Sequence, residues 1–441
     1  MRPIRSLLLT LFVVALAVPV WADGLPTAEP EDVGLSSERL ERVTDAIEAD
    51  VKSGAIPGAV AMIARDGKIA YFEARGKADT ESGAVMKKDT IFRIYSMSKP
   101  ITSVALMMLF EEGKFKLKDP VSKFIPELGD MKVLVEKEDI DEGGAFNIPE
   151  LDEEKAPGPA VDSDTYFTVP TKRDMTVQDL LRHTAGFTYG FFGNTSVDKL
   201  YLRSGILSRD RDVTDMVDRL SKIPLQYQPG TRWHYSVSVD VQGRLIEVLS
   251  GMGFDEFLEE RIFNPLKMVD TGFYVPDNKL DRFAQMYAPG GDDGLRIADA
   301  RMSRNFTNNP TMHSGGGGMV STATDYMRFC QMMLNGGVLD GERILSRKTV
   351  ELMTIDHLGD VPERDVFGGY GFGLGFAVAT DLARTGMPTS VGEYRWGGAA
   401  GTRFWIDPKE KLIGVYMVQI IPHPFSFGED FKIFTYQSIA D

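Results

Sequence analysis

The spacing of apolar positions changes along the chain, and these changes predict the order of helices and strands. Residues 38–51 carry apolar side chains at helical spacing after Ser37, which predicts a capped amphipathic helix. Two runs rich in small and β-branched residues follow, at 59–64 and 69–74. The tetrapeptide Arg65-Asp66-Gly67-Lys68 joins them and predicts a hairpin turn.

The C-terminal part of the chain has a similar arrangement. Residues 402–406 and 412–421 are apolar runs on either side of the turn Asp407-Pro408-Lys409-Glu410. Hairpins near both ends of the chain predict one antiparallel sheet built from both termini. Glycines also stand at every second position from 369 to 375, which predicts a strand that allows close approach of a neighbouring backbone.

Between the two hairpins the apolar spacing is mostly helical. The expected helices run from Ser96 to a stop at Gly113, and over 177–181, 240–249 and 255–263. We therefore expect an α/β fold of the α+β type, with an α-rich lobe inserted into the sheet. The domain would span 23–441, with an α/β lobe at about 30–95 and 320–441 and a helical lobe at about 96–319.

An acidic segment at 135–170 interrupts the predicted helical lobe. It contains the charged run 136–142 and the sequence Pro157-Gly158-Pro159. This composition predicts a solvated surface loop, with a lid over a substrate site as the alternative.

The first residues have the pattern of an export signal. Arg2 and Arg5 precede the apolar stretch 7–18, and small residues near Ala22 suit a cleavage site. We expect residues 1–22 to be a signal peptide, which predicts a periplasmic or secreted protein without membrane anchoring after cleavage. An uncleaved membrane anchor is the alternative.

Charge and cysteine content limit the partners. The 441 residues include 49 basic and 64 acidic side chains, so removal of Arg2 and Arg5 with the signal leaves 47 − 64, or −17. Such an acidic chain argues against nucleic acid as a partner. Cys330 is the single cysteine, which excludes an intramolecular disulfide, and the helical stretch 326–334 around it predicts a buried structural thiol.

The candidate chemistry begins at Ser96-Met97-Ser98-Lys99, directly before the apolar run 101–110. Helical residues three apart share a face, so Ser96 and Lys99 would lie side by side. A desolvated lysine can lose its proton and activate a neighbouring hydroxyl. A second Ser-x-x-Lys match, at 196–199, precedes no apolar run and is expected to be a solvated loop.

Other familiar sites do not fit the sequence. The five histidines lack the spacing of a helical zinc pair, so neither a metal nor another cofactor is implied. No Gly-x-Ser-x-Gly elbow is present, which argues against a Ser-His-Asp hydrolase. No Lys-Ser or Lys-Thr follows the glycine run 315–318, so it predicts a tight turn rather than a phosphate loop.

Two downstream motifs extend the pattern, namely Tyr235-Ser236-Val237 and Trp396-Gly397-Gly398. With the Ser-x-x-Lys at residue 96, their order resembles the signature of class C β-lactamases, serine penicillin-binding proteins and family VIII carboxylesterases. The resemblance covers roughly residues 35–425 and implies a β-lactamase/transpeptidase-like fold. Supporting segments, expected to be structural, are 183–186, 265–268 with Asp270 and Thr271, and 318–322 with Asp325.

The resemblance implies a role for each motif. Ser96 would be the acylated nucleophile, Lys99 its base, and Tyr235 the relay of a proton to the leaving group. Because nearby ammonium groups favour a phenolate, we expect Tyr235 to cycle between acid and base near the working pH. The backbone N–H groups of Ser96 and Ala399 would form the oxyanion hole.

Two departures from the signature bear on the substrate. Val237 replaces the asparagine of Tyr-x-Asn, and Trp396 replaces the lysine suited to a β-lactam carboxylate. Trp-Gly-Gly at this place resembles family VIII carboxylesterases, which act on short acyl esters. Substrate contacts are therefore expected at Trp396, Gly397, Gly398 and Val237.

These features predict an exported serine hydrolase that cleaves short-chain carboxylic esters, or related small amides, through an acyl-Ser96 intermediate. The alternatives are a β-lactamase or a D-amino-acid peptidase or amidase of the same superfamily. A non-catalytic binding protein on this fold is a further alternative. The sequence gives no indication of the oligomeric state.

Overall fold

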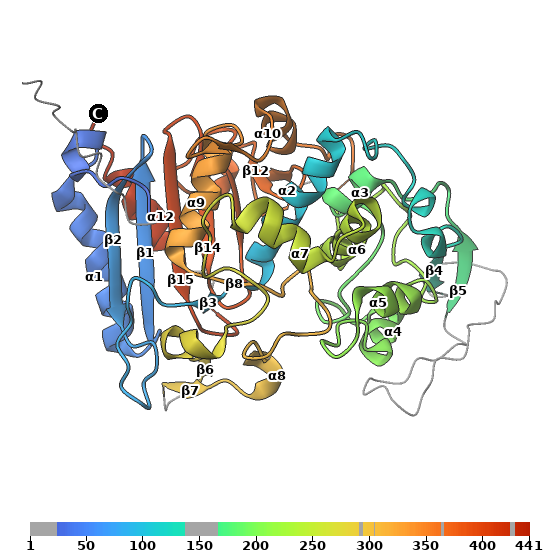
Figure 1. Ribbon diagram of the computed structural model, residues 1–441, viewed down its shortest axis with the longest axis horizontal. Helices are drawn as coiled ribbons and strands as arrows, with labels where there is room; N and C mark the ends of the chain where they lie inside the picture. The colour runs from blue at the N-terminus through green and yellow to red at the C-terminus, as the bar shows by residue number, and fades with distance from the viewer. Residues whose placement is uncertain (1–23, 137–165, 291–293, 304, 363–365, 424–427) are drawn as a thin grey trace, which may run out of the picture.

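A computed structural model describes residues 24–136, 166–290, 294–303, 305–362, 366–423 and 428–441. Its centre is a seven-stranded sheet in the order β11-β12-β13-β14-β15-β1-β2. The sheet lies on the left of Figure 1, and a helical region with α4, α5 and α6 lies on the right. The predicted combination of an antiparallel sheet with a helical lobe is confirmed. The predicted signal at 1–22 lies outside the described residues.

The two predicted hairpins form the middle and one edge of this sheet. Strands β1 (Gly58–Arg65) and β2 (Lys68–Gly76) join through Asp66 and Gly67, whose φ angles of 51° and 76° suit a tight hairpin turn. Strands β14 (Arg403–Asp407) and β15 (Leu412–Val418) form the second hairpin. Strand β1 pairs antiparallel with β15, from Ala59 opposite Val418 to Arg65 opposite Leu412, so both termini build one sheet.

The rest of the sheet comprises β11 (Tyr370–Phe372), β12 (Ala377–Ala379) and β13 (Tyr394–Gly397). The prediction of a strand through all four alternating glycines is wrong. Of these four, only Gly371 lies in β11. Gly369 and Gly375 have φ angles of 88° and 101°, which belong to turns and not to extended backbone.

Helices cover both faces of the sheet. Every residue of β1 is buried, and alternate residues join opposite cores: Val60 and Met62 face the large core, while Ala61 and Ile63 face a smaller one. Helices α1 (Ser37–Ser53) and α12 (Glu429–Gln437) pack on each other over the smaller core. Ser36, rather than the predicted Ser37, caps α1 by accepting the N–H of Arg39. Helix α9 (Ala323–Leu334) packs on β1, β14 and β15 and buries Cys330, as predicted.

The helical lobe surrounds α2 (Ser98–Glu111), which is buried from Ser98 to Leu109. The other helices of the lobe are α3 (Val177–Leu181), α4 (Ser196–Ser204), α5 (Val213–Leu220), α6 (Ser238–Ser250) and α7 (Phe254–Leu258), which continues as a π-helix over Glu259–Phe263. Smaller helices are α8 (Ala300–Ser303), α10 (Arg347–Met353) and α11 (Leu382–Thr385). Short strand pairs are β3 (Phe92–Arg93) with β8 (Val320–Ser321), β4 (Lys132–Glu136) with β5 (Tyr166–Pro170), β6 (Tyr287–Pro289) with β7 (Leu295–Ile297), and β9 (Val338–Leu339) with β10 (Glu342–Arg343).

Two predicted loops are wrong where the structure describes them. The segment 196–199 is the first turn of α4, because Thr195 and Asp198 form a reciprocal capping box there. The ends of 135–170 are strand, because residues 132–136 pair with 166–170. The remainder of that insertion, at 137–165, lies outside the described residues.

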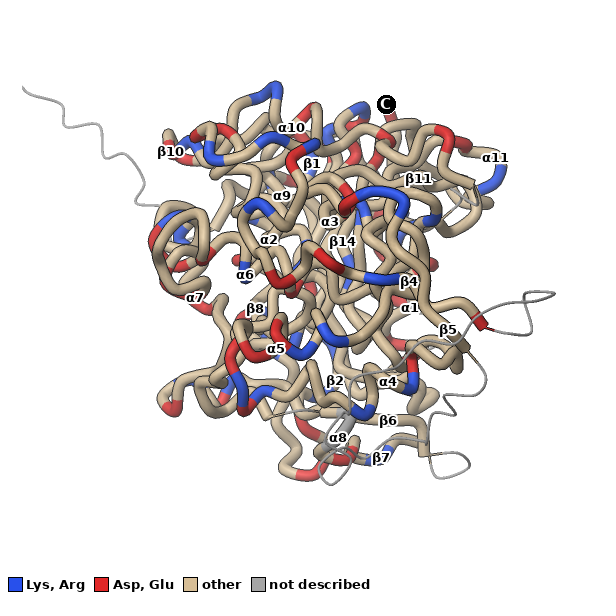
Figure 2. The backbone as a smooth tube through the Cα atoms, turned by 90° about the vertical axis from the view of Figure 1, so that its right-hand side faces the viewer, with Lys and Arg blue, Asp and Glu red and all other residues tan. Residues whose placement is uncertain are grey.

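The surface carries both signs of charge. Figure 2 shows basic and acidic residues interspersed over the outer elements of one side. Among the described residues, no helix is long and apolar enough to cross a membrane. The same residues contain no group of three or more metal-ligating side chains placed to hold an ion.

Candidate active site

Ser96 lies in a tight turn before α2. The prediction that it lies on the α-helix itself is wrong. Residues Tyr95–Met97 form a 3₁₀ turn, and α2 begins at Ser98. Tyr95 has a φ of 41°, a left-handed conformation that is costly for a residue with a side chain. Tertiary contacts hold this turn in place: Tyr326 donates to the Met97 carbonyl (2.9 Å), and the Ser98 hydroxyl accepts the N–H of Met319 (3.2 Å).

Lys99 lies beside Ser96, as the spacing predicts. Its Nζ is 3.3 Å from Ser96 Oγ and donates to the carbonyl of Gly316 at 2.5 Å. The side chain is 1% exposed, and its nitrogen lies 4.5 Å from the ring centre of Tyr235 and 5.0 Å from that of Tyr189. Burial against two aromatic faces and a carbonyl therefore fixes the lysine nitrogen at the hydroxyl.

Tyr235 completes the cluster, but its protonation differs from the prediction. Burial raises the pKa of its phenol above the ordinary value, the Asp240 charge adds to this shift, and the Ser96 and Trp396 side chains only partly offset it. The expectation of a favoured phenolate is thus wrong, because desolvation penalises the phenolate charge more than its neighbours stabilise it. Tyr235 is a neutral phenol at neutral pH.

His183 packs against the segment that contains Tyr235. Its ring centre lies 5.0 Å from that of Tyr235, and its Nδ1 accepts the N–H of Ser236 at 3.3 Å. Burial and the neighbouring Lys99 charge lower the pKa of His183 well below its ordinary value. The neutral imidazole is therefore a support for the tyrosine segment, which agrees with the structural role predicted for residues 183–186.

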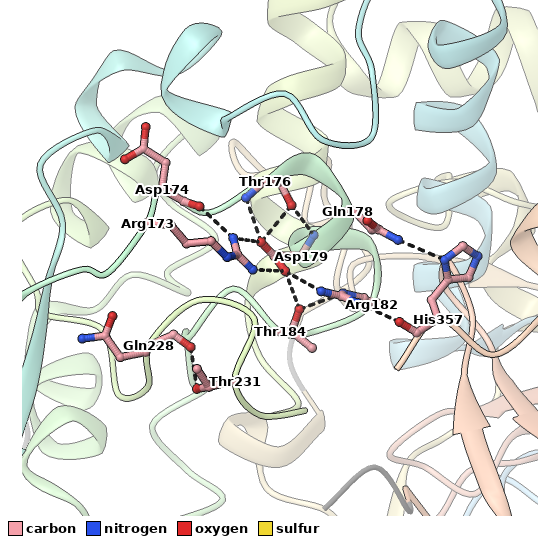
Figure 3. Close-up of polar contacts among 10 residues, drawn as sticks. All are labelled: Arg173, Asp174, Thr176, Gln178, Asp179, Arg182, Thr184, Gln228, Thr231 and His357. Atoms are coloured by element: carbon pink, nitrogen blue, oxygen red, sulfur yellow. Dashed lines mark hydrogen bonds and ion pairs between the residues drawn. The ribbon is translucent and has the colours of Figure 1, made fainter. Parts of the chain in front are cut away.

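A buried carboxylate anchors the turn that carries His183. Figure 3 shows the side chains of Arg173, Thr176, Arg182 and Thr184 converging on Asp179. Thr184 Oγ1 donates to Asp179 at 2.7 Å, and Arg173 donates at 2.6 and 3.0 Å. Burial alone would raise the pKa of Asp179, but its hydrogen bonds from Arg173, Thr176 and Thr184 lower it to about 2.

The end of β13 lies directly against the Ser96 turn. A Cβ on Gly398 would lie 2.3 Å from the carbonyl oxygen of Ile94, so only glycine allows this close approach. The N–H groups of Ser96 and Ala399 have no recorded protein acceptor in the described part of the chain. Two free donors on neighbouring backbone segments are what an oxyanion hole requires, although their role stays a prediction.

The predicted substrate contacts differ in exposure. Gly397 is partly exposed, and Trp396 is 7% exposed, with its ring centre 5.4 Å from that of Tyr235. Val237 has no exposed surface and belongs to the large core. A substrate would reach its side chain only after the surrounding residues move, so the contact predicted there stays a prediction.

An arc of aromatic rings flanks Tyr235, and the sequence motifs did not reveal it. We call Phe191, Phe192, Trp233, Phe367 and Trp396 the aromatic rim. Phe192 and Trp396 each contact Tyr235, at ring-centre distances of 5.8 and 5.4 Å. Phe367 continues the arc from Trp396 (5.5 Å) to Trp233 (6.3 Å). Phe191 and Phe192 are 51% and 63% exposed, so they present an apolar surface to solvent.

The Gly316 carbonyl, Tyr189 and the aromatic rim are contributions that the sequence analysis missed. Residues 315–317 form the predicted tight turn, but nothing in the glycine run indicates that one of its carbonyls binds Lys99. The Phe191-Phe192 pair between two glycines was the available signal for the rim. Aromatic pairs are common in cores, however, and only exposure distinguishes these two.

A serine hydroxyl beside a buried lysine, with a neutral phenol and two backbone N–H groups that donate to no acceptor among the described residues, suits nucleophilic acyl transfer. This fold and this cluster together define a class of protein, the serine hydrolases built around Ser-x-x-Lys. Within that class the chain belongs to the Beta-lactamase family, whose family model matches residues 43–432.

Known proteins agree with this assignment. The chain is 35% identical over 379 residues to Protein Rv1367c of Mycobacterium tuberculosis, covering 84% of this chain and 87% of that one. It is 30% identical over 407 residues to Esterase EstB of Burkholderia gladioli, covering 87% and 90%. Among solved structures, EstCE1, described as a hydrolase with promiscuous acyltransferase activity, superposes with a TM-score of 0.74 at 25% identity, covering 90% of this chain and 98% of that one. The predicted superfamily and fold are confirmed.

Proposed function

We propose that this protein is an exported serine esterase that hydrolyses short-chain carboxylic esters through an acyl-Ser96 intermediate. The observation that carries the proposal is the 3.3 Å contact between Lys99 Nζ and Ser96 Oγ, next to a rim built of aromatic rings. The similarity to Esterase EstB supports an ester substrate.

In the proposed first step, Lys99, after losing the proton of its ammonium form, accepts the Ser96 proton while Ser96 Oγ bonds to the ester carbonyl carbon. The backbone N–H groups of Ser96 and Ala399 stabilise the resulting oxyanion. As the bond to the alcohol oxygen breaks, the Tyr235 phenol donates its proton to that oxygen. The Lys99 ammonium, which lies over the Tyr235 ring, returns a proton to the phenolate, so both groups regain their starting states.

Hydrolysis of the acyl-enzyme uses Lys99 again. Water gives a proton to the Lys99 amine and attacks the acyl carbon, and the Lys99 ammonium returns a proton to Ser96 Oγ as the carboxylic acid leaves. An alcohol that replaces water in this step yields a new ester, and EstCE1 is described as catalysing acyl transfer of this kind.

We propose esters rather than β-lactams as substrates because of the side chain at position 396. Trp396 occupies the place of a lysine suited to a carboxylate, and its indole packs at a tilt against the rings of Phe367 and Tyr235. Such a wall offers apolar contact and no charge for an anionic substrate. We therefore propose neutral esters with a short acyl group as the substrate class.

Export rests on the pattern of residues 1–22, with two arginines before an apolar stretch. N-terminal sequencing of the protein recovered from a periplasmic fraction would test it. A mature N-terminus near residue 23 is expected, and a cytoplasmic protein that retains residues 1–22 would contradict export.

The catalytic proposal is tested with p-nitrophenyl acetate and butyrate against a chromogenic cephalosporin, using residues 23–441. We expect ester turnover to exceed cephalosporin turnover and to disappear in Ser96→Ala. Faster cephalosporin turnover would refute the substrate class. Undiminished esterase activity in Ser96→Ala would refute the mechanism.

A further inference from the structure

A buried carboxylate, Asp240, lies next to the glycine turn that binds Lys99. Asp240 is 1% exposed and stands in the first turn of α6, five residues after Tyr235. Its Oδ1 accepts the hydroxyl of Ser314 at 2.5 Å and the N–H of Gly316 at 3.1 Å. Neither of these bonds goes to the backbone of α6. The carboxylate therefore binds the turn that contains Ser314 and Gly316 and does not cap its own helix.

Gly316 connects this carboxylate to the catalytic lysine. Its N–H binds Asp240, and its own carbonyl accepts from Lys99 Nζ at 2.5 Å. Asp240 thus holds Gly316 in place through its N–H. The Gly316 carbonyl in turn holds the Lys99 nitrogen, which lies 3.3 Å from Ser96 Oγ.

The fit at Gly316 is close on the Asp240 side. A Cβ at this position would lie 2.4 Å from Asp240 Oδ2 and 2.7 Å from the Tyr189 hydroxyl. The carboxylate and the phenol therefore pack directly on the Gly316 backbone, and the peptide can shift little while Asp240 stays in place.

We propose that Asp240 is a positioning residue for acyl transfer: it holds the Ser314–Gly316 turn so that the Gly316 carbonyl keeps Lys99 at the Ser96 hydroxyl. The inference rests on the proposed function, because it assigns Asp240 to the same Ser96 and Lys99 chemistry. Asp240 acts through Gly316 and does not itself contact the reacting atoms.

The positioning role of Asp240 requires a hydrogen-bond acceptor but no negative charge. Two substitutions therefore distinguish this role from one that depends on the charge of the carboxylate. Asp240→Ala removes the acceptor and frees the turn, and we expect kcat to fall about 100-fold with KM changed less than about threefold. Asp240→Asn keeps an acceptor oxygen for Ser314 and Gly316 and should restore kcat to within about fivefold of the wild type. Equal losses in both variants would overturn the positioning role.

A readout that does not depend on the ester separates this inference from the proposed function. The rate at which a fluorophosphonate labels Ser96 reports how well the hydroxyl is activated. We expect slow labelling in Asp240→Ala and near-normal labelling in Asp240→Asn. Normal labelling in Asp240→Ala overturns the inference, whereas normal wild-type labelling without turnover of any ester refutes only the substrate class.

The matched control is Asp325→Asn and Asp325→Ala. Asp325 is also a buried carboxylate in the first turn of a helix, and it accepts the Asp270 N–H (2.7 Å) and the Thr271 hydroxyl (2.9 Å). Its variants should retain kcat and the labelling rate, even where thermal stability falls. If Asp240→Ala does not fold, Gly316→Ala tests the same link, because its Cβ would displace the turn from Asp240. Wild-type kcat in folded Gly316→Ala would overturn the inference.

Discussion

The side-chain nitrogen of Lys99 lies 3.3 Å from the hydroxyl of Ser96, although the two residues belong to different helical elements. Ser96 stands in a 3₁₀ turn and Lys99 in the first turn of α2. The left-handed Tyr95 redirects the chain immediately before Ser96, so the hydroxyl sits at the end of a buried helix. A hydroxyl and an amine held in contact in this way need little reorganisation before acyl transfer.

We expect Ser96→Ala to lower ester turnover by at least about 1,000-fold, because no other hydroxyl takes over the covalent step. The second Ser-x-x-Lys offers a matched control in Ser196→Ala. Ser196 Oγ donates to Glu136 at 3.1 Å, so this variant should lose some thermal stability but retain kcat. Steady-state rates on p-nitrophenyl butyrate compare the two. A large loss of kcat in Ser196→Ala would contradict our assignment.

We expect Tyr235→Phe to affect esters with poor leaving groups most. Burial raises the pKa of Tyr235, so the phenol is a proton donor at neutral pH. Without it, an alkoxide must leave unprotonated, and kcat for ethyl butyrate should fall about 100-fold. A p-nitrophenolate leaves without a proton, so kcat for its ester should fall much less. Equal losses on both esters would exclude proton donation to the leaving group.

The aromatic rim should bind the apolar part of the substrate. Phe191→Ala and Phe192→Ala remove exposed rings of the rim, of which Phe192 contacts Tyr235 and Phe191 contacts Phe192. Each should raise KM for aryl esters several-fold, equivalent to about 1 kcal/mol. KM for methyl acetate should stay unchanged, because that ester is too small to cover the rim. Val85→Ala, at an exposed apolar residue after β2, is the control. An unchanged KM for aryl esters in both phenylalanine variants would rule out binding at the rim.

Asp179 should make stability depend on pH in the acid range. Hydrogen bonds to Arg173 and other donors lower its pKa from 3.8 to about 2, so its contribution is complete above the unfolded-state pKa and is lost as pH falls toward 2. Asp179→Asn should cost about 3 kcal/mol at pH 7, and the difference from the wild type should shrink between pH 4 and pH 2. Urea unfolding at several pH values measures this. A difference that stays constant over this range would show that the carboxylate charge is not responsible.

Much of the fold follows from local patterns. The hairpins at 58–76 and 403–418 agree with the predicted runs because a turn such as Asp66-Gly67 and the apolar runs on either side of it are encoded within a few residues. Helix α3 has the predicted bounds for a similar reason, since Thr176 and Asp179 form a capping box at its start. The same kind of box at Thr195 and Asp198 begins α4, so the loop predicted at 196–199 is wrong.

The sequence by itself determined which groups are present, namely Ser96, Lys99 and Tyr235, and that the first two lie within one helical turn of each other. Only the tertiary structure decided how they are held and charged. Gly316 is 217 residues along the chain from Lys99, and Asp240 binds it from a third segment. Burial, which raises the pKa of Tyr235, arises only when these segments pack together, because desolvation depends on the surrounding atoms and not on neighbours in the sequence.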